Sequence, residues 1–293
     1  MKNKNLLAIH IAVILFGASG VFVKMIPMSA LLLTLGRALF SALALYIYVH
    51  FHHYSLRLYR MKDYFWNLLA GLFLTLHWFF FIMSIQVSTV AIGTITFAAY
   101  PLFVVFMEPY VFKEKFQIKN LLSVVMIVLG ITFLIPSFAF TNTSTLGIIY
   151  GLIGSFSFAV LSLINRKLSS HYESVVITLY EQTVATCLLT VFISIINPPL
   201  IQADTLTFFY LVVYGVVFTG VAHSLYIYGL RGVKAQTASI ISVLEPVYSI
   251  VLAMLFLNEK LLYQDIIGIV MIFLAVIVAT FQNRLELQKE SSK

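Results

Sequence analysis

The stretch ISVLEPVYSIVLAMLFLNEK, from Ile241 to Lys260, holds a glutamate and a proline near the middle of an otherwise apolar run. It aligns without a gap with TFAAYPLFVVFMEPYVFKEK, from Thr96 to Lys115, which begins 145 residues earlier. Pro101 falls on Pro246, and the pair Glu114-Lys115 falls on Glu259-Lys260. The same offset places VMI at 125–127 on VMI at 270–272. Such self-similarity indicates that the chain contains two copies of one unit.

The composition indicates which solvent surrounds the chain. Of its 293 residues 61% are hydrophobic and only 10% are charged, with a mean hydropathy of +1.01. Soluble domains are about a quarter charged, so this chain cannot cover itself with a polar surface. A spanning helix needs about 20 apolar residues, and ten such runs lie near 6–24, 30–52, 64–86, 90–112, 118–137, 146–166, 173–196, 205–230, 235–257 and 262–283. We therefore expect an all-α integral membrane protein with ten transmembrane helices, multi-pass in the cell (inner) membrane, with the lipid bilayer as its main partner.

The positive charges predict the topology, because Lys and Arg accumulate in cytoplasmic loops. With the N-terminus inside, fifteen of the eighteen Lys and Arg residues fall on the cytoplasmic side. Two, Lys24 and Lys260, fall outside, and Arg37 lies within a span. This alternation supports ten spans and places both termini in the cytoplasm. It also explains the basic pI near 9.4 without a nucleic-acid partner.

Five spans in each copy have a topological consequence. An odd number makes the second copy enter the membrane from the opposite face, so residues 1–137 and 146–283 are predicted to be inverted repeats, followed by a cytoplasmic tail at 284–293. Inverted repeats suit alternating access around a site near the midplane. The alternative is a duplication that was kept for folding or packing alone.

These residues resemble a known family. The ten-span layout, PLFVVFMEPYVFKEK in the fourth span, EPVYSIVLAMLFLNEK in the ninth and GRALFSALAL in the second are similar to the drug/metabolite transporter superfamily, EamA type. The resemblance covers nearly the whole chain and implies transport of a metabolite, amino acid or drug. It also implies a central cavity lined by spans 1–4 and 6–9, with spans 5 and 10 at the periphery and at dimer contacts in some members. The copies differ here, because Tyr100 stands where Glu245 stands and Glu108-Pro109 matches Ala253-Met254.

Four ionisable residues lie within predicted spans, where charge is costly and usually faces a partner or a wet cavity. Glu245 lies near the midplane, in a polar stripe with Ser242, and is suited to bind a substrate ammonium or to carry a proton; a structural hydrogen bond is the alternative. Arg37 and Glu181 occupy corresponding spans, so Arg37 can grip a substrate carboxylate or pair with Glu181 as a structural contact or gate. Glu108 lies nearer the cytoplasmic end, and that position favours contact with water.

Other candidates are shape-determining or aromatic. Pro101 and Pro246 each remove a backbone donor and either free carbonyls toward a cavity or form simple packed bends. His77, Trp78, Tyr100 and His223, with Tyr226, can form an aromatic wall for a cation, although a lone membrane histidine is more often a hydrogen-bonded helix contact. Glu114 and Glu259 end their spans beside lysines, which favours a helix-end ion pair or a gate. A metal at His50, His52 and His53 is a weaker reading than a solvated interface.

The motifs favour secondary transport over catalysis. The sequence has no G-x-x-x-x-G-K-[ST] phosphate loop, no H-E-x-x-H and no G-x-S-x-G, so neither an internal ATPase nor an enzyme is expected. We expect a secondary active transporter without cofactor or metal that moves a small polar metabolite, with amino-acid efflux as the best candidate and a proton as a candidate coupling ion. A drug or nucleotide-sugar-type exchanger of the same fold is the alternative. An intramembrane enzyme or a receptor is the alternative from another class. Monomer and homodimer both stay open.

Overall fold

The computed structural model describes residues 2–88, 93, 96–97, 99–114, 121, 124–126, 128–129, 142–196, 204–257, 266–267, 270–271 and 274. The predicted fifth and tenth spans lie mostly outside these residues, and so does Glu259. The elements in chain order are α1 (Lys2–Met25), α2 (Ala30–Phe51), α3 (Met61–Val87), α5 (Tyr100–Phe112), α7 (Asn142–Ser169), α8 (Ser174–Ile196), α9 (Thr205–Gly215), η1 (Val216–Val221), α10 (Ala222–Leu230), α11 (Ala235–Ser242) and α12 (Leu244–Leu257).

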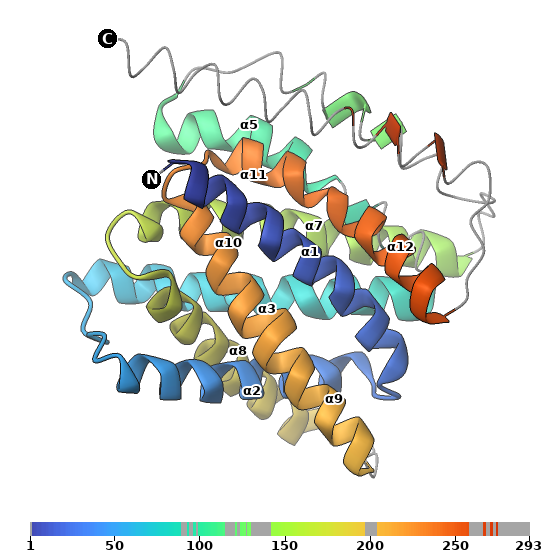
Figure 1. Ribbon diagram of the computed structural model, residues 1–293, viewed down its shortest axis with the longest axis horizontal. Helices are drawn as coiled ribbons and strands as arrows, with labels where there is room; N and C mark the ends of the chain where they lie inside the picture. The colour runs from blue at the N-terminus through green and yellow to red at the C-terminus, as the bar shows by residue number, and fades with distance from the viewer. Residues whose placement is uncertain are drawn as a thin grey trace.

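The described residues form helices and no strands, and the helices named above overlap predicted apolar runs, with α5 beginning at Tyr100 within the run at 90–112. Five are long and apolar enough to cross a membrane: Ala30–Phe51, Met61–Val87, Thr145–Ser169, Ser174–Ile196 and Thr205–Leu230. The last of these consists of α9, η1 and α10, which Figure 1 shows as one continuous rod. The all-helical prediction is thereby confirmed for this part of the chain, while the count of ten and the side of the termini remain predictions.

The two halves of the chain interleave. Helix α2 packs against α8 and α9, and α3 packs against α7 and α8. Helix α1 lies along α11 and α12 and also contacts α10 (Figure 1). Each of these contacts joins a helix from the first half to one from the second, so the core belongs to both halves together.

Two close helix contacts recur at nearly the repeat spacing. A Cβ on Gly71 of α3 would lie 2.5 Å from Val184 Cβ and 3.1 Å from the Glu181 carbonyl of α8. A Cβ on Gly215, 144 residues later, would lie 2.6 Å from Phe40 Cβ and 3.0 Å from the Arg37 carbonyl of α2. Phe40 and Arg37 precede Val184 and Glu181 by the same 144 residues. This recurrence supports a structural repeat, and its boundaries remain predicted.

The first proline of α5 lies next to a helix break, and the backbone carbonyl that it leaves without a helical donor bonds to a side chain instead. Pro101 follows a turn at Ala99 and cannot bond to the Phe97 carbonyl, which accepts from Ser155 Oγ at 3.1 Å. Pro109 within α5 likewise leaves the Val105 carbonyl free, and Gln236 Nε2 lies 3.5 Å from it.

The matching break lies between α11 and α12, just before Pro246. The N–H of Val243 bonds to the Ile240 carbonyl at 3.3 Å, so the Ser239 carbonyl loses its usual helical donor. The hydroxyl of Tyr100 donates to that carbonyl at 2.8 Å. Both predicted prolines therefore lie at packed breaks, and the freed groups named here are paired across helices, as a bilayer requires.

The glycine at 151 generates a stability prediction. Its Cβ position lies 1.7 Å from Thr96 Oγ1 and 2.5 Å from Thr96 Cβ, so any side chain forces the helices apart. Gly151→Val is expected to lower the free energy of unfolding by about 1–3 kcal/mol, measured by thermal unfolding of the purified protein in detergent. Ile149→Val on the same helix, at a residue that is 49% exposed, is the control. Equal stability of the two variants would contradict this packing.

Candidate functional site

Arg37 lies in the middle of α2 and is buried, with 5% of its surface exposed. Its guanidinium carbon lies 3.9 Å from the ring centroid of Trp78 and 4.6 Å from that of Tyr214. Its Nε donates to Thr219 Oγ1 at 3.0 Å. Two aromatic faces and one hydroxyl thus hold the cation in place of water, an arrangement that stabilises a desolvated guanidinium.

The partner hydroxyl comes from a local irregularity. Val216–Val221 form a π-helix, a form that is rare and frequently found at functional sites. Thr219 Oγ1 donates to the Tyr214 carbonyl five residues earlier at 2.9 Å while accepting from Arg37. The next residue must be small, because a Cβ on Gly220 would lie 2.9 Å from Ser41 Oγ. Sequence reasoning missed Thr219, whose only signal was a threonine beside a glycine in the eighth span.

Glu181 pairs with a histidine and not with Arg37. His223 Nε2 of α10 lies 2.8 Å from Glu181 Oε2 of α8, and both side chains are buried. The reading in which Glu181 neutralises Arg37 by direct contact is therefore wrong. The other carboxylate oxygen, Oε1, is buried without a hydrogen-bond partner in the described part of the chain. Buried polar atoms are nearly always paired, so an oxygen without a described partner is an exception. It can still accept a hydrogen bond.

Trp78 lies between Arg37 and the Glu181–His223 pair. The Arg37 guanidinium lies over its face, and its ring centroid lies 6.3 Å from that of His223. The residues come from α2, α3, α8 and α10, so both halves of the chain contribute. We call Arg37, Trp78, Glu181 and His223 the central layer. Trp78 and His223, predicted as parts of an aromatic wall, do lie together.

Glu245 lies in the first turn of α12 and is partly buried. Its carboxylate is near enough to Arg37 and Tyr214 to be part of their charge environment, although no ion pair joins it to a described residue. Its backbone carbonyl faces Gly17 of α1, whose Cβ position would lie 3.0 Å away. The predicted glutamate thus lies near the central layer with its carboxylate uncommitted by hydrogen bonds to the described residues.

The remaining predicted aromatic and hydroxyl residues are already bonded within the helix core. His77 Nδ1 lies 3.0 Å from the Gly154 carbonyl, the hydrogen-bonded helix contact that was the alternative for this residue. Tyr100 is fully buried and donates to Ser239. Ser242 Oγ donates to the Ala238 carbonyl at 2.9 Å, and Tyr226 shares a hydrogen bond of 3.1 Å with Ser162. These contacts place Tyr100 and His77 in the packing between helices.

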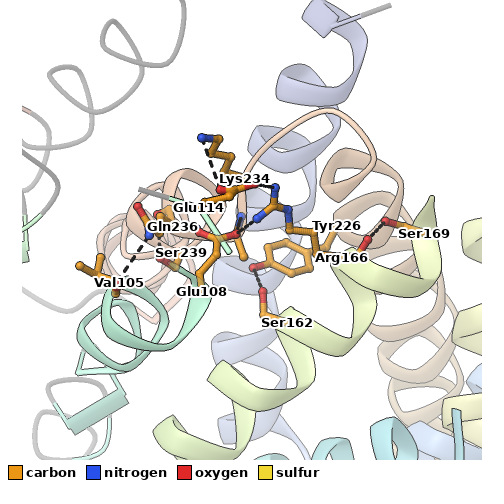
Figure 2. Close-up of polar contacts among 11 residues, drawn as sticks. Val105, Glu108, Glu114, Ser162, Arg166, Ser169, Tyr226, Lys234, Gln236 and Ser239 are labelled. Atoms are coloured by element: carbon orange, nitrogen blue, oxygen red, sulfur yellow. Dashed lines mark hydrogen bonds and ion pairs between the residues drawn. The ribbon is translucent and has the colours of Figure 1, made fainter. Parts of the chain in front are cut away.

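A second polar cluster lies where α5, α7 and the start of α11 meet (Figure 2). Glu108 of α5 is 0% exposed, so the expectation that it reaches water is wrong. Its Oε1 accepts from Arg166 Nη1 at 2.5 Å and from the Ala235 N–H at 2.6 Å. Its Oε2 accepts from the Gln236 N–H at 2.8 Å. A carboxylate at the first N–H groups of a helix is favoured by their unpaired donors and by the helix dipole.

Glu114 extends this cluster beyond the end of α5. It lies 2.6 Å from Arg166 Nη2 and 3.4 Å from Lys234 Nζ, as the predicted helix-end ion pair requires. Burial alone would raise the pKa of Glu114, but the hydrogen bonds and charges of Arg166 and Lys234 outweigh it and lower the pKa below its ordinary value. Sequence reasoning counted Arg166 and Lys234 only as topology signals. Glu259, for which the sequence predicts the same kind of ion pair or gate, lies outside the described residues.

Among the described residues, no three His, Cys, Asp or Glu side chains come together in a way that could hold a metal ion. His50 and His53 instead line a cavity of about 250 Å³ at the end of α2, together with Tyr46, Val49, Tyr54 and Leu56.

The fold and site define a multi-pass membrane protein with a buried, charged central layer. The EamA-like transporter family matches the chain twice, at residues 3–135 and 145–281. The chain therefore belongs to the EamA-like transporter family and is a membrane transporter. The resemblance expected from its sequence motifs is confirmed.

Individual relatives agree with this assignment. An "uncharacterized transporter YxxF" of Bacillus subtilis is 25% identical over 278 residues, which are 93% of this chain and 88% of that protein. An "uncharacterized transporter" of Archaeoglobus fulgidus is 25% identical, covering 93% and 94% of the two chains. An "uncharacterized inner membrane transporter YicL" of Salmonella typhimurium is 26% identical, covering 96% and 97%. One crystal structure shares the fold with a TM-score of 0.83 at 16% identity, covering 96% of this chain and 98% of the other.

The Glu181–His223 contact yields a prediction about stability. His223→Leu leaves a fully buried carboxylate without its donor, so the free energy of unfolding should fall by about 2 kcal/mol. In a Glu181→Gln background the same change should cost clearly less, and thermal unfolding of the four proteins closes the cycle. An equal cost of His223→Leu in both backgrounds would show that the two side chains do not interact.

Proposed function

We propose that this protein is a secondary active transporter of the cell inner membrane that moves a small zwitterionic metabolite, with amino-acid efflux as the best candidate. The observation that carries the proposal is the central layer. There Trp78 contacts a buried cation, Arg37, on its face and the His223 ring, which in turn bonds to the buried carboxylate of Glu181. The other oxygen of that carboxylate has no partner among the described residues. An amino acid carries complementary charges at its two ends.

Each residue of the central layer has a proposed role. The forked donors of Arg37 suit a substrate carboxylate, and Thr219 with Tyr214 fixes the orientation of its plane. Oε1 of Glu181, which has no partner among the described residues, suits the substrate ammonium, while His223 holds the other oxygen. Trp78 forms the shared wall between the two charged groups. Ser242, Tyr100 and His77 shape this wall through the helix contacts that they make.

Glu245 is the proposed proton-coupling residue. Its carboxylate is partly buried, makes no ion pair with a described residue and interacts electrostatically with Arg37. Protonation would therefore change the field at the site where we place the substrate carboxylate. The chain has no phosphate-binding loop for ATP, so an ion gradient or exchange is the natural source of energy.

Alternating access is the proposed mechanism. The paired breaks beside Pro101 and Pro246 lie next to the interface between α5 and α11, which joins the two halves. Discontinuous helices in equivalent positions of two repeats are typical of transporters that rock around a central site. Glu108 and Glu114 close the cytoplasmic end in this proposal, and Glu259 is the proposed counterpart on the other side.

A drug or nucleotide-sugar-type exchanger is the alternative on the same fold, and the number of charges distinguishes them. A nucleotide sugar carries phosphates and calls for several cations, whereas the central layer offers one, Arg37. An enzyme or a receptor would need a catalytic constellation or a signalling domain, and the sequence motifs indicate neither.

Counterflow in proteoliposomes tests the proposal. Vesicles preloaded with an unlabelled amino acid should accumulate the labelled form transiently, and a panel of amino acids, sugars and nucleotides identifies the class of substrate. Glu245→Gln should reduce proton-driven accumulation by roughly tenfold, the equivalent of losing about 1.4 kcal/mol of coupling, while exchange persists. Thr190→Val, at an exposed residue of α8, is the matched control. Proton-driven accumulation by Glu245→Gln at the wild-type rate removes Glu245 from the coupling mechanism.

A further inference from the structure

The contacts around Glu108 form a binding site for a carboxylate that the protein itself fills. We propose that Arg166 and the first turn of α11 form a second carboxylate-recognition site on the transport path, at its cytoplasmic end. Glu108 occupies this site in the state described here, and the carboxylate of the transported solute takes its place when that end opens. This inference rests on the proposed function, because it assigns a second station to the same solute.

The geometry of the site matches a carboxylate on both oxygens. One oxygen receives a guanidinium N–H at 2.5 Å and a backbone N–H at 2.6 Å, and the other receives a backbone N–H at 2.8 Å. Charge-assisted bonds of this kind are short and strong, and a guanidinium combined with a helix N-terminus recognises the planar group specifically. Phe112 adds an aromatic face 4.2 Å from the Arg166 guanidinium carbon. Figure 2 shows Arg166 of α7 directed at Glu108 of α5.

The occupant and the site belong to different halves of the chain. Glu108 is on α5, whereas Arg166 is on α7 and Ala235 and Gln236 begin α11. Any motion that withdraws Glu108 leaves two backbone donors and the Nη1 side of the Arg166 guanidinium without their acceptor, while Nη2 keeps its bond to Glu114. Such groups are costly to leave unpaired, so another anion is strongly favoured to replace Glu108.

A row of polar residues on α7 connects this site with the middle of the bundle. Ser162 lies seven residues after Ser155 and Asn165 three residues after Ser162, spacings that place all three on one side of the helix, which ends near Arg166. The two serines are bonded across helices, to the Phe97 carbonyl and to the Tyr226 hydroxyl. Asn165 is 0% exposed, and neither its amide nitrogen nor its amide oxygen has a described partner. An unpaired buried amide one residue from Arg166 is the second feature that points to a polar ligand here.

The mirrored position has no such internal carboxylate. Glu108 aligns with Ala253, so at this position of the repeat only the first copy carries an acid. We therefore expect displacement of an internal carboxylate to control opening on that side alone.

Chemical rescue tests whether the site accepts a free carboxylate. Glu108→Ala should unfold at a lower temperature than wild type, and formate should raise its unfolding temperature by about 3 °C relative to chloride at equal ionic strength, as expected for a ligand near tenfold its Kd. Glu108→Gln, whose amide still fills the space, and Glu108→Ala/Arg166→Met should show no such rise. Equal responses to formate and chloride in Glu108→Ala, or an undiminished rise without Arg166, would overturn the site.

A second measurement keeps Glu108 in place and serves if Glu108→Ala does not fold. In a Cys187→Ala background, Asn165→Cys supplies a thiol that an aqueous maleimide reaches only when the cytoplasmic end opens. Formate and acetate should speed labelling roughly threefold, a shift of about 0.65 kcal/mol in the opening equilibrium, whereas chloride and acetamide should not. Labelling that ignores carboxylates would contradict displacement of Glu108. Both assays use formate and measure no transport. A failed flux experiment would therefore count against the proposed function without deciding whether this site binds a carboxylate.

Discussion

A bilayer penalises every charge and every backbone polar group that lacks a partner, and this requirement shapes the whole bundle. The carbonyl left free by Pro101 accepts from Ser155, and the Ser239 carbonyl accepts from Tyr100. In each case the donor lies on another helix, so a break in one helix becomes a bond between two. The breaks are thereby also places where the two halves are joined.

The two polar clusters satisfy this requirement to different degrees. Around Glu108 both carboxylate oxygens have short partners, which is what a closed contact needs. In the central layer one oxygen of Glu181 has no partner among the described residues. Outside that layer, Glu245 makes no ion pair with a described residue. Spare hydrogen-bonding capacity in a buried place is costly for folding alone, because an orphaned polar atom forfeits its hydration. Under the function proposed above, a solute supplies the missing partners.

The sequence predicted the elements well and the partners poorly. Apolar run length and the alternation of charge located the helices, because both follow from the thickness and polarity of the membrane. The same reasoning singled out Arg37, Glu181 and Glu245 as ionisable residues within spans; Arg37 and Glu181 are buried and Glu245 is partly buried. It could not determine which side chains meet, since Glu181 reaches His223 across 42 residues and Arg37 reaches Thr219 across 182. Arg166 was missed because its position at a helix end looks like an ordinary cytoplasmic charge until α5 is placed against it.

The central claim is that Arg37 and Glu181 bind the opposite ends of one zwitterion. The most direct measurement compares thermal stabilisation of the purified protein by the amino acid most active in the counterflow panel, by its amide and by its N-acetyl derivative. The account predicts that the wild type responds to the free amino acid alone. It also predicts that Arg37→Gln loses discrimination against the amide, and that Glu181→Gln loses discrimination against the N-acetyl derivative. Equal stabilisation of the wild type by all three compounds would contradict it.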